Sequence, residues 1–203
     1  MCIRDSYNTI RTLTSFVRKI INIIQSSIWP EYSIAYGKND INRMRNLHRK
    51  AFSIAFPLTI IITIFIMIFG KTIYEIWTNN KIAFDYSLAF SFCFLTIIRN
   101  LWDTSNVVMI ATNKHVQFCS YLFSSSILAL VLSITLIQFY KDIEVFVYSQ
   151  LALDLLLCYH VIKRAMILTN DTASSFFYSP ISLAKQQINK IILHKDKKLH
   201  LLL

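Results

Sequence analysis

The chain has 203 residues, of which 55% are hydrophobic and only 16% are charged, and its formal net charge is +10 at pH 7. So apolar a composition predicts a polytopic membrane protein and argues against a soluble multidomain protein. The basic residues fall between apolar runs instead of sharing one face with aromatic side chains, so nucleic acid is not expected as a partner.

The opening residues, "MCIRDS", resemble the translated remnant of a sequencing adaptor, so residues 1–6 are expected to be a non-native leader. They lack the apolar core and the cleavage site of a signal peptide. The natural protein is therefore expected to be longer, with this chain as its C-terminal part.

Five apolar segments follow in chain order, and each is long enough to be a membrane-spanning helix. The second is the clearest, because it carries no charged residue from Ala51 to Gly70 and can cross about 30 Å of hydrocarbon. The runs exceed strand length and lack hairpin signals between them, which disfavours a membrane barrel. The expected fold is an all-α polytopic transmembrane helix bundle with spans at about residues 10–36, 51–77, 82–111, 116–140 and 143–164.

Lysine and arginine are unevenly divided between the two sides of this bundle. The 37–50 connection and the segment after the fifth span are rich in them, whereas the opposite connections contain only Lys71, Lys81 and Lys141. By the positive-inside rule, the basic side and the C-terminus are expected to be cytoplasmic. Residues 168–203 are expected to be a basic cytoplasmic tail, either with an amphipathic helix at 180–193 on the anionic inner leaflet or only partly ordered.

Polar side chains recur at helical spacing along three of the apolar segments, so each set shares one helix face. Such a stripe cannot face lipid, because a charged side chain at bilayer depth costs at least about 2.5 kcal/mol. The stripes are Arg11, Ser15, Arg18, Asn22 and Gln25 in the first segment, Thr96, Arg99, Asp103 and Asn106 in the third, and Gln150 and Asp154 in the fifth.

These stripes either line a hydrated cavity of net positive charge or form buried contacts between helices in which each charge is neutralised. Arg99 and Asp103 favour the second interpretation, because they lie one turn apart and can pair along their own helix. Arg18 favours the first, because no acidic residue lies on its stripe and an unpaired buried cation is costly. Lys19 is expected at the cavity rim or against another helix. Asp154 is expected to be either the partner of such a cation or a protonatable coupling site.

The order of these segments resembles a known family. An apolar helix with arginine and lysine is followed by "PEYSIAYGKNDINRMRNLHRKAFSIAFPL", then by "FGKTIYEIW", and then by a long polar-striped helix ending in "VVMIATNKH". Over about residues 7–167 this order is similar to the second half of the polysaccharide and O-antigen flippases of the multidrug/oligosaccharidyl-lipid/polysaccharide exporter superfamily. The resemblance implies a twelve-helix transporter with two lobes, in which the five spans would be about helices eight to twelve.

The resemblance also implies a function and a place in the cell. The protein would flip a polyprenyl-pyrophosphate-linked oligosaccharide of cell-envelope polysaccharide synthesis across the bacterial inner membrane by alternating access, together with the missing N-terminal lobe of the same protein. Its partners would be membrane lipid and this lipid-linked substrate, and no enzymatic activity, metal or cofactor is implied. Cations would bind the pyrophosphate and amides would hydrogen-bond the sugars. The substrate-binding residues would be Arg18, Lys19, Asn22, Gln25, Arg99, Asp103, Asn106, Gln150 and Asp154.

Other functions predict other patterns. A drug/cation antiporter of the same superfamily should have a cavity dominated by acidic residues, whereas these stripes are mainly cationic and neutral. A membrane-embedded glycan polymerase or glycosyltransferase should carry a large outside loop with histidines or carboxylates, but the loops "TNNK" and "YKD" are too short. A non-transporting structural membrane subunit is a further alternative. It would be favoured if replacing Arg18 by leucine affected only the packing of neighbouring residues.

Overall fold

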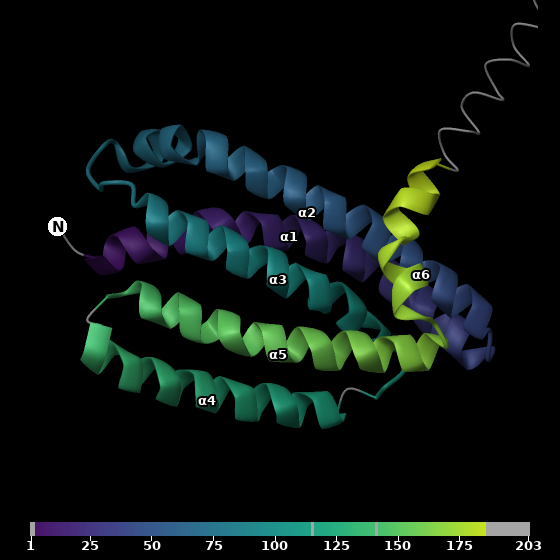
Figure 1. Ribbon diagram of the computed structural model, residues 1–203. Helices are drawn as coiled ribbons and strands as arrows, with labels where there is room; N and C mark the ends of the chain where they lie inside the picture. The colour runs from purple at the N-terminus through teal and green to yellow at the C-terminus, as the bar shows by residue number, and fades with distance from the viewer. Residues whose placement is uncertain (1–2, 115, 141, 186–203) are drawn as a thin grey trace, which may run out of the picture.

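The computed structural model describes residues 3–114, 116–140 and 142–185, and within these ranges it is helical and contains no β-strand. This confirms the all-α class expected from the sequence. Five long helices and one short helix follow each other along the chain (Figure 1). They are α1 (Ile3–Gly37), α2 (Ile41–Thr78), α3 (Tyr86–Ala111), α4 (Val116–Tyr140), α5 (Glu144–Thr169) and α6 (Ala173–Phe177).

The five long helices lie side by side in an up-and-down bundle (Figure 1). Helices α1, α3 and α5 run in one direction, and α2 and α4 run in the other. The central helix is α3, which packs against α1, α2 and α5, whereas α4 lies at the edge and packs mainly against α5. Helix α3 thus lies between its two parallel neighbours α1 and α5, and these three helices carry the polar stripes.

Asparagine and aspartate residues mark many of the helix ends. Asp40 accepts a hydrogen bond from the backbone N–H of Arg43 at 2.9 Å, and Asp85 accepts two from the first turn of α3. With only two glycines in the chain, asparagine takes over the left-handed conformation in which helices commonly end. The described residues with positive φ are Asn39, Asn79, Asn80, Asn113 and Asn170.

Several helix boundaries differ from the sequence expectation, including the start of α1, which lies at Ile3 and not near residue 10. The connection at 37–50, expected to be a loop, is helical from Ile41 onward. Asp40 caps this extension, and the buried side chain of Met44 anchors it in the core, so basic residues that were assigned to a loop lie on a helix. Asp85, expected within the third span, is instead the N-cap of α3.

Three helices are long and apolar enough to cross a membrane, as judged by length and composition: α2, residues Phe118–Tyr140 of α4, and α5. Few residues of the α4 segment are buried within the bundle, so its apolar surface is open to lipid. Helices α1 and α3, whose polar stripes lower their hydropathy, are not among the three. The structure therefore supports a membrane protein with three candidate spans and does not by itself establish the five expected from the sequence.

The segment after α5 folds back over one end of the bundle, where α6 lies across the start of α2 (Figure 1). Phe176 of α6 is fully buried, and its ring lies 4.5 Å from the His48 ring and 4.3 Å from the Phe52 ring, centroid to centroid. Residues 179–185 are also helical. The rest of the amphipathic helix expected at 180–193 lies outside the described residues.

Candidate functional site

The best-formed charged contact inside the bundle joins α3 to α5. The Nε atom of Arg99 lies 3.1 Å from Oδ2 of Asp154, and the Nη2 group of Arg99 donates a hydrogen bond to Oδ1 at 3.2 Å. The Asp154 side chain is only 2% exposed. Arg99 was expected to pair with Asp103 on its own helix, and this expectation is wrong, because α3 packs closely enough on α5 for Arg99 to reach across.

Asp103 is the partner of Arg18 on α1 instead. The Nε atom of Arg18 lies 4.0 Å from Oδ2 of Asp103, which is the outer limit of an ion pair and too long for a hydrogen bond. The Arg18 side chain is 44% exposed, whereas that of Asp103 is 16% exposed. No acidic residue lies on the α1 stripe, and the partner of Arg18 lies on α3, where periodicity along a single helix does not reveal it.

Neutral polar side chains extend this region on both sides. The Nε2 group of Gln25 on α1 lies 3.5 Å from the hydroxyl of Thr104 on α3, and both side chains are buried. Asn100 of α3 lies 3.4 Å from the hydroxyl of Thr59 on α2. The polar contacts therefore link α3 to α1, to α2 and to α5. We call Arg18, Gln25, Arg99, Asp103, Thr104 and Asp154 the polar seam.

Four of the expected site residues do not make side-chain contacts in the seam. Lys19 and Asn22 are exposed on α1, and Nζ of Lys19 lies over the ring of Phe16 at 5.1 Å from its centroid. Gln150 is exposed on α5. Asn106 is buried on α3, and its side-chain oxygen has no hydrogen-bond partner among the described residues.

The charges of the polar seam balance, because two arginines face two aspartates. This differs from the net-positive cavity expected from the sequence. On α1, next to the seam, further positive charge comes from the exposed residues Arg11 and Lys19, which have no ion-pair partner among the described residues. The seam thus combines a closed pair, Arg99–Asp154, with a loose pair at its open side, Arg18–Asp103.

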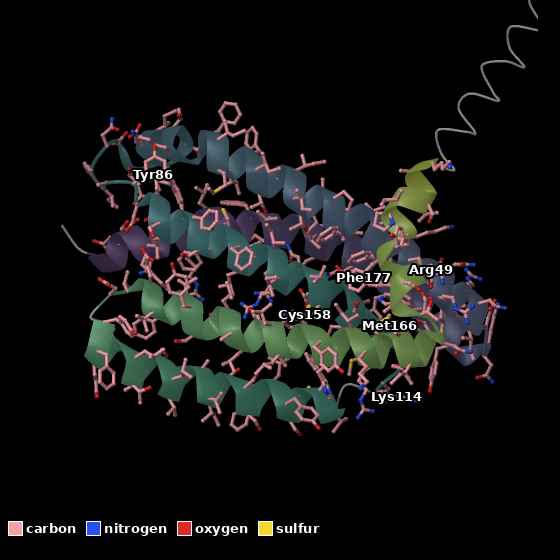
Figure 2. The ribbon with its side chains drawn as sticks, viewed as in Figure 1. Arg49, Tyr86, Lys114, Cys158, Met166 and Phe177 are labelled. Carbon is pink, nitrogen blue, oxygen red and sulfur yellow. The ribbon has the colours of Figure 1, made fainter. Side chains whose placement is uncertain are left out.

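A second charged cluster, which the sequence analysis missed, holds α6 against α2; we call Arg49, Asp171 and Ser175 the basic-end cluster. Arg49 binds Asp171 in a bidentate manner, with its Nε atom 2.9 Å from Oδ2 and its Nη2 group on Oδ1, and it also donates to Ser175 at 2.8 Å. Figure 2 shows Arg49 at the end of the bundle covered by α6.

The carboxyl group of Asp171 is well satisfied, since it also accepts hydrogen bonds from the Ser175 hydroxyl at 2.7 Å and from the Thr172 backbone at 2.8 Å. Its side chain is 1% exposed. Burial alone would raise the pKa of this carboxyl, but the hydrogen bonds from Arg49, Ser175 and Thr172 lower it to about 2. Asp171 and Thr172, directly after Asn170, are the only nearby residues in the sequence that indicate this cluster. Its arginine, Arg49, lies more than a hundred residues away in sequence.

Comparison of the chain with models of protein families, with curated proteins and with solved structures finds no match. Its function is therefore inferred from the polar seam and from the order and spacing of its segments.

Proposed function

We propose that this chain forms one lobe of a transporter that flips a polyprenyl-pyrophosphate-linked oligosaccharide across the bacterial inner membrane by alternating access. The observation that carries the proposal is the Arg18 side chain, which is 44% exposed and held by Asp103 at only 4.0 Å. The resemblance of the segment order to the polysaccharide flippases supplies the substrate class. The polar seam supplies side chains that could interact with a charged headgroup inside the membrane.

The depth of the polar seam in the membrane follows from the packing of α1 and α3 along α5. Helix α5 is long and apolar enough to cross a membrane, and α3 packs along it with the Arg99–Asp154 pair between them. Helix α1 packs along α3 in turn. If α5 crosses the membrane, α1 and α3 cross it as well, and Arg18 lies within the hydrocarbon region. An exposed arginine there costs at least about 2.5 kcal/mol, so this face of α1 must meet water, substrate or the other lobe.

The chemistry of the loose pair suits an anionic headgroup. A guanidinium carries five N–H donors, and Asp103 approaches only the Nε side of Arg18, so the remaining donors are available for a pyrophosphate. Lys19 and Asn22 on the exposed face of α1 would assist, as would Gln150 on α5. Gln25 and Asn106 are buried and would reach sugars only in another state of the transport cycle. Asp154 is the partner of Arg99 and would hold α5 against α3.

A non-transporting structural subunit is the second candidate, and the closed Arg99–Asp154 pair favours it, because buried ion pairs also serve to fix helix register. A drug/cation antiporter gains no support, since acidic residues do not outnumber basic residues in the seam.

Export measured per molecule of inserted protein, in cells expressing the complete reading frame, separates transport from structure. We expect Arg18→Lys to retain part of the export, Arg18→Ala to lose most of it and Arg18→Glu to abolish it. Losing a charge-assisted hydrogen bond should weaken substrate binding by about 1.5–3 kcal/mol. Arg43→Ala is the matched control, because Arg43 pairs with Glu31 at the basic end, away from the seam. Undiminished export by Arg18→Ala would end the proposed role.

The proposed orientation places the basic end of the bundle and the C-terminus in the cytoplasm. In intact cells an impermeant thiol reagent should then modify Asn80→Cys and leave Asn46→Cys unmodified, since both positions are exposed at opposite ends of α2. The reverse labelling pattern would refute this orientation.

A further inference from the structure

A cavity of about 370 Å³ lies at the basic end of the bundle, where α3 ends, α4 begins and α5 passes between them. Three basic side chains line it: Lys114 in the connection after α3, and His160 and Arg164 on α5. Its other walls are mainly apolar and include Met109 and Phe118. Figure 2 shows Lys114 at this end, close to the junction of α3 and α4. None of the seam residues lines this cavity.

The basic groups of this cavity lack the protein partners that their neighbours have. On α2, at the same end of the bundle, Arg43 pairs with Glu31, Arg45 donates to the carbonyl oxygen of Thr169, and Arg49 binds Asp171. In the part of the chain that the structure describes, Lys114 and Arg164 have neither an ion-pair partner nor a side-chain hydrogen bond, and both are exposed. The cavity therefore offers positive charge without a protein anion to balance it.

A second cavity, of about 320 Å³, borders the first and lies between α4 and α5. The two share His160, and the second is lined mainly by apolar residues such as Leu128 on α4 and Leu153 on α5. Arg164 and Leu153 are separated along α5 by about 16 Å at the rise of an α-helix. A charged site at the end of two candidate spans thus adjoins an apolar groove that leads toward their middle.

We propose that Lys114, His160 and Arg164 bind the phosphate of an anionic glycerophospholipid, and that one acyl chain of this lipid lies in the groove between α4 and α5. The charge complements a phosphodiester headgroup, and basic pockets between spanning helices at the anionic leaflet are suited to such headgroups. The site also has a structural consequence. Helix α4 packs mainly against α5, so a lipid in the groove would fill space that no other helix fills. The inference requires membrane insertion and does not depend on the transported substrate.

Native mass spectrometry of the purified chain tests the charged part of the site, with dioleoylphosphatidylglycerol and dioleoylphosphatidylcholine as probes. We expect selective retention of phosphatidylglycerol by the unaltered chain and a roughly thirtyfold loss of that retention in Lys114→Gln/Arg164→Gln, since each of the two basic residues contributes about 1 kcal/mol near an anionic surface and about 1.4 kcal/mol corresponds to a factor of ten. The matched control is Lys50→Gln/Lys163→Gln, which removes the same charge from exposed residues that do not line the cavity.

The groove is tested by Ser124→Trp, which places a large side chain at an exposed position lining the second cavity. We expect this variant to lose phosphatidylglycerol retention although its charge is unchanged. Inorganic phosphate is the probe for the free anion, and it should not raise the thermal unfolding midpoint as phosphatidylglycerol does.

Three outcomes would overturn the proposal. They are equal retention of the two lipids, unchanged retention of phosphatidylglycerol in both Lys114→Gln/Arg164→Gln and Ser124→Trp, or a rise in the unfolding midpoint with inorganic phosphate that equals the rise with phosphatidylglycerol. If the double variant does not fold, as judged by its helical circular dichroism, Lys114→Gln and Arg164→Gln are measured singly. Each should then show a smaller loss in the same direction, and no loss in either would also overturn the proposal.

Discussion

Two arginine–aspartate pairs in this bundle have opposite characters. At the basic end, Arg49 binds Asp171 through two donor groups, and the Asp171 side chain is 1% exposed. In the polar seam, Arg18 approaches Asp103 only to 4.0 Å, and the Arg18 side chain is 44% exposed. In the first pair the buried carboxylate accepts several hydrogen bonds within the protein, whereas in the second pair the two side chains are too far apart for a hydrogen bond.

This difference indicates a structural role for the Arg49–Asp171 pair and a role in transport for the Arg18–Asp103 pair. The basic-end cluster fixes α6 across the bundle and seats Phe176 against His48 and Phe52, so its loss should appear in stability. The Arg18–Asp103 pair is screened on its open side and should contribute little to stability. Its loss should appear in transport.

The largest expected effect on stability is that of Asp171→Ala. It leaves the Arg49 guanidinium and the Ser175 hydroxyl without their acceptor, so we expect a loss on the order of 3 kcal/mol in the free energy of unfolding, at the low end for a buried pair because Arg49 is partly exposed. Denaturant unfolding in detergent, followed by circular dichroism, measures it. Asp142→Ala is the control, since Asp142 is an exposed aspartate. A change no larger than that of the control would show that the cluster does not hold α6.

The pH dependence of stability should show the same cluster. The pKa of the Asp171 carboxyl is lowered to about 2 in the folded chain, so its contribution is present above about pH 4 and is lost as the pH falls toward 2. By this linkage the loss amounts to about 2 kcal/mol. The unfolding midpoint of Asp171→Asn should therefore fall less than that of the unaltered chain over this pH window. Parallel pH curves for the two proteins would contradict the assignment.

The smallest expected effect on stability is that of Arg18→Leu. The two side chains are 4.0 Å apart and that of Arg18 is 44% exposed, so we expect a change below about 1 kcal/mol in the free energy of unfolding. The same unfolding experiment measures it beside Asp171→Ala. A loss as large as that of Asp171→Ala would show that the two pairs have the same structural role and would remove the contrast between them.

The sequence predicts the helices more accurately than it predicts the contacts between them. Helix α4 covers the same residues, 116–140, as the uncharged apolar run, because hydropathy alone determines where such a helix begins and ends. The start of α2 at Ile41 was missed, although Asp40 is a recognisable N-cap. The many basic residues after Asp40 are typical of a connecting loop, and this charge pattern outweighed the capping signal of Asp40.

Within the site, periodicity correctly assigned polar residues to shared helix faces but could not pair them. Arg99 had two candidate partners, Asp103 at one turn and Asp154 on another helix, and only the packing of α3 on α5 decides between them. The same limit applies to Arg49 and Asp171, which lie on segments far apart in sequence. Long-range pairing depends on tertiary geometry, which a single sequence without homologues does not reveal.

The most direct test of the central claim is the charge swap Arg18→Asp/Asp103→Arg in the complete protein. The swap keeps an ion pair between α1 and α3 but moves the guanidinium from the exposed face of α1 to the more buried face of α3. The account predicts a protein that inserts and unfolds like the unaltered one yet exports little or no lipid-linked oligosaccharide per molecule. Export at the unaltered rate would contradict it, because the pair would then serve only to hold the two helices together.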